Sequence, residues 1–385
     1  MSPAITWHMI TGEYPPQAGG VSDYSRLVAR GLAAAGDAVH VWAPENSGTD
    51  PGDDGVTIHR LAGHFGPRAL AELSRSIGRR AGARLLVQYV PHAFGFKAMN
   101  LPFCLWLYAH TRKNGGAAVM FHEVNLGFLP GDPARYRVLD AATKVMAMLV
   151  ARSAAQIFVA APVWEPLLRR YVAHDQPISW LPVPSTVAVV DDCARIAGAR
   201  RRYAPAGGPV IGHFGTRPPA IAAMLRALIP RILAANPALT MVLIGANGDT
   251  FRESIVRENL ELSARVVATG VLSAAELSIA ISSCDVMAQP YPDGVSSRRT
   301  SVMAALDHAR ATVTTDGLFT EPLWRQSEAV ALVEADDAGA FASAVTELVA
   351  DDARRRRYAS TAKALYANRF DLRHTIEALR APACA

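Results

Sequence analysis

The sequence has few cysteines, and they are far apart. Its 385 residues include four of them, at Cys104, Cys193, Cys284 and Cys384. They form no CxxC pair and have no matching histidine cluster, so the sequence predicts neither a disulfide framework nor a zinc site. The predicted strand ends also lack a DxD-type pair of carboxylates. We therefore expect reduced thiols, no bound metal and no other cofactor.

Long hydrophobic runs are missing as well. The longest apolar stretch, from Ala98 to Ala109, is interrupted by Asn100 and Pro102. It falls short of the roughly 20 residues that a membrane-spanning helix needs. The segment from Met1 to Thr11 lacks the basic region, apolar core and cleavage site of a signal peptide. These absences predict a cytoplasmic protein.

The charge is modest, with a formal net value of +5. Much of it lies in arginine runs at Arg75, Arg79, Arg80, Arg84 and Arg354 to Arg357. The favoured interpretation of such a run is a solvated helix face. If a binding patch is present, an anionic membrane surface fits better than nucleic acid, because no stacking aromatic residues are interleaved with the arginines.

The size and patterning predict two α/β domains. Apolar residues make up 50% of a 385-residue chain, which is too long for one ordinary core. Short β-rich runs alternate with helical patterns, which is typical of βαβ units and a mostly parallel sheet. The expected strands of the first half are Ile5–Thr11, Ala38–Ala43, Leu85–Val90 and Ala118–His122, and the first expected helix is Val21–Ala35.

The alternation stops at Ser179–Val190, where two prolines interrupt a segment with no amphipathic period. We place the hinge there, which gives a first domain at 1–188 and a second at 189–367. The segment 368–385 is expected to pack back on the first domain. In the second half the expected strands are Val210–Phe214, Thr240–Gly245, Val266–Thr269, Val286–Gln289 and Ala311–Thr315, and the expected helices are Ala220–Ala235, Ala274–Ser282 and Asp351–Arg369.

Ligands of open parallel sheets bind at the carboxyl ends of the strands, so the loops there are the candidate sites. The first such loop, Gly12–Gly20, holds two prolines and the diglycine Gly19-Gly20. Glycine lets backbone amides approach an anion at a helix N-terminus. The alternative is a plain strand-to-helix turn.

The string YPPQAGGVSDYSRLVARGLAAAGDAVHVW resembles the opening of the family-4 retaining glycosyltransferases of the GT-B fold (glycosyl transferases group 1). Five later segments are similar to that family in the same order: Phe121–Val124, Ile211–Thr216, Val242–Gly245, Gly270–Leu277, and Cys284–Val286 leading to Pro290–Ser296. The resemblance implies two Rossmann-like domains facing each other across a cleft. It also implies a nucleotide-sugar donor on the second domain, an acceptor on the first, and retention of configuration without a bound metal.

The sequence departs from the family at its charged positions. The usual pair of glutamates is replaced by Asp293 and by a residue near Ser301 or Ala304. The usual lysine after the second domain's first strand is missing, and only Arg217 follows it. Because diphosphate charge must be neutralised, Arg298 and Arg299 are further candidates, since a guanidinium fork suits phosphate oxygens.

The resemblance assigns provisional roles to individual residues. The catalytic group is His122, Asp293 and Arg217. The donor diphosphate is expected at Gly19, Gly20, Gly215, Thr216, Arg298, Arg299 and Ser301. The nucleoside is expected at Gly245, Val271, Leu272 and Glu276, and the donor sugar at Gly294, Val295 and Ser296. The acceptor side is Glu13, Tyr14, Glu123 and His92. A lone strand-end histidine such as His122 is more often structural, and only the resemblance favours function.

The expected co-substrate is a UDP- or GDP-sugar, and the acceptor is a small molecule, a lipid-linked molecule or a saccharide. No nucleic acid partner is expected. Two rivals stay open, because fold does not fix reaction. One is a sugar-nucleotide epimerase or phosphorylase on the same architecture. The other is a nucleotide-sugar-binding protein without turnover.

Overall fold

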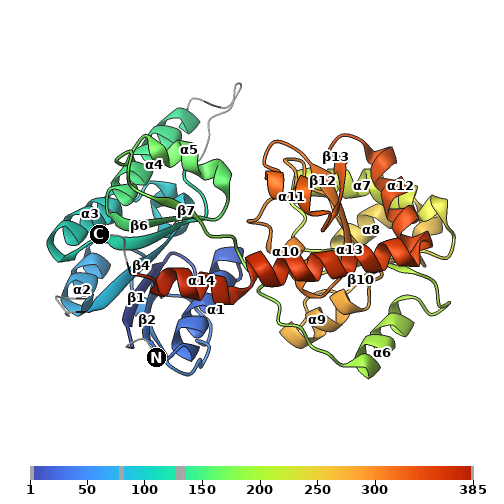
Figure 1. Ribbon diagram of the computed structural model, residues 1–385, viewed down its shortest axis with the longest axis horizontal. Coiled ribbons are helices and arrows are strands. Elements are labelled where there is room, and N and C mark those ends of the chain that lie inside the picture. The colour runs from blue at the N-terminus through green and yellow to red at the C-terminus, as the bar shows by residue number, and fades with distance from the viewer. Residues whose placement is uncertain (1–3, 78–81, 126–132, 134, 383–385) are drawn as a thin grey trace. The chain divides into compact units, whose positions relative to one another are not determined.

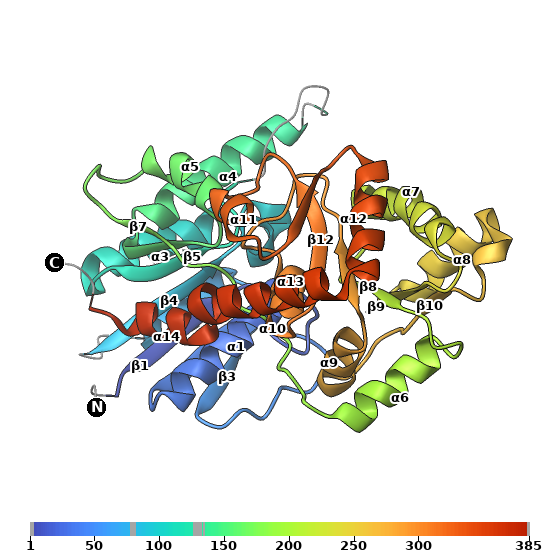
Figure 2. The same ribbon diagram turned by 45° about the vertical axis from the view of Figure 1, so that its right-hand side comes forward.

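The structure is a computed structural model that describes residues 4–77, 82–125, 133 and 135–382 (Figures 1 and 2). It divides into two compact units. The first runs to Pro182 and takes up the chain again from Leu372, and the second is Val183–Asp371. The chain thus passes from one unit to the other between residues 182 and 183 and again between residues 371 and 372. The sequence predicted these changes between residues 188 and 189 and between residues 367 and 368.

The first unit is built on a seven-stranded sheet in the order β3-β2-β1-β4-β5-β6-β7. Its neighbouring strands pair in parallel. Its strands are β1 (Thr6–Thr11), β2 (Ala38–Pro44), β3 (Val56–Leu61), β4 (Ala83–Tyr89), β5 (Ala117–Phe121), β6 (Ala154–Val159) and β7 (Ile178–Trp180). Its helices are α1 (Gly20–Ala34), α2 (Pro67–Ile77), α3 (Leu101–Asn114), α4 (Arg135–Ala151), α5 (Glu165–Arg169) and α14 (Leu372–Arg380).

Strands β3, β6 and β7 were not predicted, so Leu85–Val90 belongs to the fourth strand and not the third. β3 carries the polar residues Thr57, His59 and Arg60 and is an edge strand, which hides it from a search for apolar runs. β7 forms inside the segment predicted as the hinge. It is a short edge strand that pairs with only one neighbour, β6.

The C-terminal helix α14 belongs to the first unit and lies beside α1 (Figure 1). Arg84 donates hydrogen bonds of 2.9–3.1 Å to the carbonyl oxygens of residues 379, 380 and 381. Arg380 pairs with the buried Asp37 at 3.2 Å. Gly31 allows the close packing, because a Cβ there would lie 2.7 Å from the Cδ1 of Ile376. The hydrogen bonds from Arg84 cap the C-terminal end of α14, where a cation is favourable.

The second unit is a six-stranded parallel sheet in the order β10-β9-β8-β11-β12-β13. Its strands are β8 (Val210–Phe214), β9 (Thr240–Ile244), β10 (Val266–Ala268), β11 (Val286–Gln289), β12 (Ala311–Asp316) and the unpredicted β13 (Ala331–Glu334). Its helices are α6 (Cys193–Tyr203), α7 (Pro219–Ala235), α8 (Gly248–Glu258), α9 (Ala274–Ser282), α10 (Thr300–Asp307), α11 (Pro322–Ser327), α12 (Ala338–Ala350) and α13 (Asp352–Leu365). The prediction of two Rossmann-like α/β domains is confirmed.

The arginine run in α13 is largely compensated within the unit. Arg354 pairs with Glu347 on α12, and both Arg355 and Arg356 pair with Asp352 on α13 itself. This matches the interpretation as a solvated helix face. In the first run Arg84 serves as a cap, and Arg79 and Arg80 lie outside the described residues.

Candidate active site

In the first unit the loop after β1 is packed tightly. Gly12 lies against η1 (Pro91–Phe94), so a Cβ there would be 2.3 Å from the carbonyl oxygen of Ala93. Gly19, at the start of α1, lies over Glu13, and its Cβ would be 2.6 Å from a Glu13 carboxylate oxygen. A Cβ on Gly20 would meet nothing within 4 Å. Gly20 is exposed, so no side chain covers the start of α1 at this residue.

His122 follows β5 and is 8% exposed. Its Nε2 lies 2.9 Å from the Oε1 of Gln88 on β4, and the Tyr24 ring on α1 meets the imidazole edge-on at 4.8 Å. Burial lowers the pKa of His122 to about 3. The imidazole is therefore neutral at physiological pH and can hydrogen bond but cannot act as a cation.

Three of the predicted acceptor-side residues lie together. Nδ1 of His92 is 3.6 Å from a carboxylate oxygen of Glu123. Burial raises the pKa of Glu13, which His92 partly offsets and Glu123 reinforces. Loops after β1, β4 and β5 thus bring two carboxylates and an imidazole to one edge of the sheet, where hydroxyl groups of an acceptor could hydrogen bond.

Tyr14 does not join them. Its ring is 0% exposed, and the Arg60 guanidinium lies 5.8 Å from the ring centroid. Arg60 also donates to the carbonyl oxygen of Pro15, at 2.5 Å, and pairs with Asp50. The structure thus corrects the prediction for this residue: Tyr14 anchors the loop from inside and is not available to an acceptor.

In the second unit the loop after β8 carries a half-buried arginine beside a glycine with a positive φ. Gly215 has φ +129°, a conformation that favours glycine. The Arg217 guanidinium donates to three carbonyl oxygens, those of Gly215 at 3.0 Å, Gly245 at 3.4 Å and Ala246 at 2.7 Å. Burial lowers its pKa, although Asp249 partly offsets the effect. Among the described residues no ion pair reaches Arg217, so its charge is available to an anion.

Ser301 lies next to this loop. A Cβ on Gly215 would be 3.5 Å from that of Ser301, whose hydroxyl is 2.8 Å from the hydroxyl of Tyr291. Ser301, one of the two residues predicted near the family's second glutamate, thus carries a hydroxyl that already has the Tyr291 hydroxyl as partner. Thr216 is exposed in the same loop.

Asp293, Arg298 and Arg299 form one cluster. Arg298 donates to one Asp293 carboxylate oxygen at 2.7 Å, and Arg299 donates to the other. Arg299 also lies over the Tyr291 ring at 4.5 Å from its centroid, and Arg298 over Phe319 at 5.3 Å. The two arginines were predicted to meet the diphosphate directly. In the structure they share a carboxylate, which leaves the cluster with one net positive charge.

Two of the three residues predicted to bind the donor sugar, Gly294 and Val295, use their amides within the loop. The N–H of Gly294 donates to Tyr291 at 3.1 Å and that of Val295 to Thr315 at 2.8 Å, both through carbonyl oxygens. Both residues are buried, and a Cβ on Gly294 would lie 2.3 Å from Thr320 Oγ1. These two amides hold the loop in place. Ser296 is also buried, and its hydroxyl has no partner among the described residues.

Glu321 was not predicted from the sequence, yet its carboxylate holds this loop through hydrogen bonds. The carboxylate is 6% exposed and accepts from the amide of Ser297 at 2.9 Å and from Trp324 Nε1 at 2.6 Å. Burial raises its pKa, while these hydrogen bonds oppose the rise. The only signal in the sequence is a glutamate directly before the proline that starts α11.

The predicted nucleoside residues lie on the loops after β9 and β10, which meet in a bridge between Gly245 and Gly270. Val271 is 83% exposed, whereas Leu272 packs against the core of the unit. Glu276 is exposed and completes a capping box with Ser273 at the start of α9. Its carboxylate therefore already has a structural partner.

Buried polar atoms without partners occur in both units. In the second unit several lie at the strand ends, and among the described residues these include both amide atoms of Gln289, His213 Nε2, Arg217 Nε, Arg299 Nε and Ser296 Oγ. Such atoms cost free energy unless a partner is supplied, and native structures contain few of them. Those at this edge could take hydrogen-bond partners from outside the chain.

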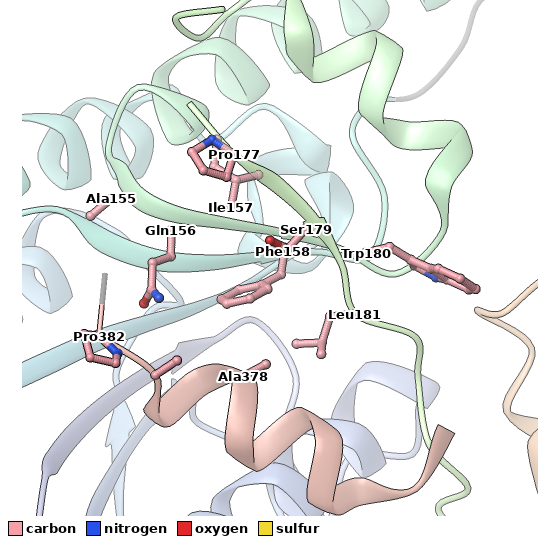
Figure 3. A pocket seen from close by; sticks show the side chains of 11 residues that line it. Ala155, Gln156, Ile157, Phe158, Pro177, Ser179, Trp180, Leu181, Ala378 and Pro382 are labelled. Carbon is pink, nitrogen blue, oxygen red and sulfur yellow. The ribbon is translucent and has the colours of Figure 1, made fainter. Parts of the chain in front are cut away.

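Two well-formed cavities lie elsewhere. One, of about 280 Å³, is in the first unit between β6, β7 and α14, with Phe158 and Leu181 pointing toward α14 and Trp180 pointing away (Figure 3). The other, also about 280 Å³, lies between α7 and α12 in the second unit. No predicted site residue lines either one.

The described part of the chain contains no cluster of three or more metal-ligating His, Cys, Asp or Glu residues. In the same residues no helix is long and apolar enough to cross a membrane. Cys104 and Cys284 are buried and free, Cys193 is exposed and free, and Cys384 lies outside the described residues.

Two Rossmann-like α/β units with candidate ligand loops at their strand ends place the chain in the GT-B fold class. Within the second unit, residues 208–351 match the family described as Glycosyl transferases group 1. The predicted resemblance to group 1 is confirmed for this segment, and sugar transfer is the activity that the match supports.

Three solved structures illustrate the fold. Sucrose-phosphate synthase from Thermosynechococcus elongatus is 18% identical, with 97% of each chain covered and a TM-score of 0.71. Anabaena HepE in complex with UDP-glucose is 13% identical, with 97% of this chain and 98% of that chain covered and a TM-score of 0.69. An α,α-trehalose-phosphate synthase (UDP-forming) from Burkholderia vietnamiensis is 15% identical, with 100% and 98% covered and a TM-score of 0.63. No curated protein sequence matches the chain.

Proposed function

We propose that this glycosyltransferase uses a nucleoside diphosphate sugar as donor and transfers the sugar with retention of configuration, without a bound metal. The observation that carries the proposal is the strand-end edge of the second unit. There the half-buried Arg217 has carbonyl partners and no ion pair among the described residues, Gly215 has a positive φ, and several buried polar atoms lack partners.

The diphosphate suits this edge because it is a compact anion. Arg217 supplies a positive charge that no carboxylate among the described residues pairs with, and the start of α7 adds helix-terminal amides beyond Pro219. Arg299, held by Asp293 over the Tyr291 ring, adds the remaining charge of its cluster. Fixed charges of this kind stabilise the departing diphosphate without reorganisation during the reaction.

Similar proteins support the choice of donor. One of the solved structures named above holds UDP-glucose, and another is named as UDP-forming. UDP- and GDP-sugars are therefore the first donors to test. The acceptor is proposed at the first unit's strand ends, where Glu13, His92 and Glu123 lie and His122 follows β5.

In the proposed reaction the bond from the anomeric carbon to the diphosphate oxygen breaks. A bond from the acceptor oxygen to the same face of that carbon forms. The acceptor proton passes to the departing phosphate oxygen, so the reaction needs no pair of carboxylates of the glycosidase type.

Peripheral contact with an anionic membrane remains a prediction. The pairing of most α13 arginines with carboxylates argues against it.

The test is transfer from UDP- and GDP-sugars to a panel of acceptors, with the anomeric configuration of the product read by NMR. Retention is expected, with activity unchanged by EDTA. An inverted product, or strict dependence on magnesium or manganese, would overturn the proposal. Donor binding with no transfer to any acceptor would favour a binding protein instead, and epimerisation of the donor alone would favour an epimerase.

A further inference from the structure

Gln88 is a polar residue in an apolar strand and is 1% exposed. Its neighbours in sequence, Val87 and Tyr89, belong to the hydrophobic core of the first unit. Since side chains alternate along a strand, Gln88 lies on the opposite face, with His122. Burying an amide is costly unless its atoms are hydrogen bonded, so this glutamine needs an explanation.

The amide makes one side-chain contact, from its Oε1 to His122 Nε2 at 2.9 Å. The Gln88 Nε2 atom has no partner within the described residues. A residue retained only for fold stability would be expected to satisfy both halves of its amide or to be apolar. We therefore attribute the presence of a buried amide at this position to its hydrogen bond with the imidazole.

The chemistry of this contact fixes the state of the histidine. An amide oxygen can only accept a hydrogen bond, so His122 must carry a proton on Nε2. Burial lowers the pKa of the imidazole to about 3, so no second proton is present at neutral pH. Nδ1 then holds a lone pair. No hydrogen bond to it comes from the described residues, and the edge-on Tyr24 ring restricts rotation.

We propose that Gln88 is a positioning residue that holds His122 in the tautomer with the proton on Nε2, so that Nδ1 accepts a hydrogen bond from a substrate hydroxyl. The reference to a substrate hydroxyl rests on the proposed function, whereas the tautomer does not. A hydrogen bond between neighbours that fixes the tautomer and the ring orientation is a general way to prepare a histidine. The opposite amide orientation would leave the proton on Nδ1 and make His122 a donor.

The decisive experiment is NMR of the full chain with ¹⁵N-labelled histidine, with the His122 signals assigned from their absence in His122→Ala. We expect a protonated Nε2 and an unprotonated Nδ1 that do not titrate between about pH 5 and pH 8. In Gln88→Leu the signals should move toward a mixture of tautomers. A proton on Nδ1 in the unmodified protein, or an unchanged tautomer in Gln88→Leu, would overturn the proposal. No substrate is needed, so this result is independent of whether the proposed transfer occurs.

Kinetics give a second arm. Gln88→Leu should lower kcat about tenfold with little change in donor KM, because only the orientation of His122 is lost. The matched control is Gln176→Leu, which removes an amide from the same unit whose Nε2 donates to the carbonyl oxygen of Ala154 at 2.9 Å. Equal losses in the two variants would contradict a positioning role.

Gln88→Glu keeps the size of the side chain and the hydrogen-bond acceptor but adds a negative charge. It is also the variant to use if Gln88→Leu does not fold. The carboxylate still accepts from Nε2 but raises the pKa of His122, because a negative charge favours the imidazolium. Below that raised pKa Nδ1 is protonated and cannot accept, so activity should fall as the pH falls through it. The unmodified enzyme should lack this acid limb. Identical pH profiles for the two proteins would count against the proposal.

Discussion

The strand-end edges of the two units carry opposite electrostatics on the same architecture. In the first unit the loops after β1, β4 and β5 hold the carboxylates of Glu13 and Glu123 and a histidine that burial keeps neutral. In the second unit the corresponding edge holds Arg217 and a cluster with two arginines for one carboxylate. Two parallel sheets thus prepare different sites, and the loop residues rather than the fold decide which ligand each one suits.

Removing Arg217, a cation without an ion pair among the described residues, from the second unit's strand-end edge should have the largest effect. Arg217→Met should lower kcat/KM by about 10² to 10³, because a preorganised charge at the departing diphosphate is lost. Steady-state kinetics with a UDP- or GDP-sugar would measure it. Arg325→Met is the matched control, since Arg325 forms a surface ion pair with Asp316 in the same unit. Comparable losses of kcat/KM in the two variants would show that Arg217 has no special role at the cationic edge of the second unit.

The neutral histidine of the first unit should come next. His122→Ala should lower kcat and kcat/KM by a similar factor, about 10², with the donor Kd nearly unchanged, because the contact strengthens in the transition state. Kinetics combined with donor titration would separate the two effects. If the alanine variant does not fold, His122→Asn keeps a polar group there. Normal turnover in a folded variant would return His122 to a structural role.

Asp293, the carboxylate that holds the two arginines, should matter less than Arg217 or His122. Asp293→Asn should raise the donor KM about tenfold, because Arg298 and Arg299 lose a charged partner that orients them. Asp316→Asn removes a carboxylate that pairs with a single exposed arginine and serves as the control. An unchanged kcat/KM in Asp293→Asn would remove this cluster from the donor site.

The smallest effect should come from the diglycine. A Cβ at Gly20 meets open space, so Gly20→Ala should keep the melting temperature and raise the KM of a ligand that approaches the amides a few-fold. A Cβ at Gly19 meets only the end of the Glu13 side chain, which can move aside, so Gly19→Ala should also keep the melting temperature while displacing that carboxylate. Thermal melts and kinetics on both variants would check the pair, and an unchanged KM in Gly20→Ala would assign these amides to the fold alone.

The strands that carry the second unit's site could be predicted closely, because apolar runs such as Val210–Phe214 and Val286–Gln289 are buried in the sheet. Edge strands β3 and β13 were missed, since partly exposed strands lack that pattern. Side-chain partners were harder still. Nothing local in the sequence joins Gln88 to His122 or Ser297 to Glu321, because these contacts depend on how strands and loops meet in space.

The family resemblance indicated which residues belong to the candidate site, but it did not indicate their burial or their side-chain partners. Asp293, Arg298 and Arg299 were predicted as separate contacts to a donor, and only the structure shows that they form one paired cluster. Tyr14 lies in the predicted loop, yet burial makes it an anchor.

The most direct test of the cationic second-unit edge is calorimetric titration of the full chain, in EDTA, with a nucleoside, its monophosphate and its diphosphate in the uridine and guanosine series. The diphosphate of one series should bind at least about tenfold more tightly than its nucleoside, since charge-assisted hydrogen bonds are worth about 1.5–3 kcal/mol each. That gain should disappear in Arg217→Met and persist in Arg325→Met. Equal affinities for nucleoside and diphosphate, or a gain that requires added magnesium, would contradict the account.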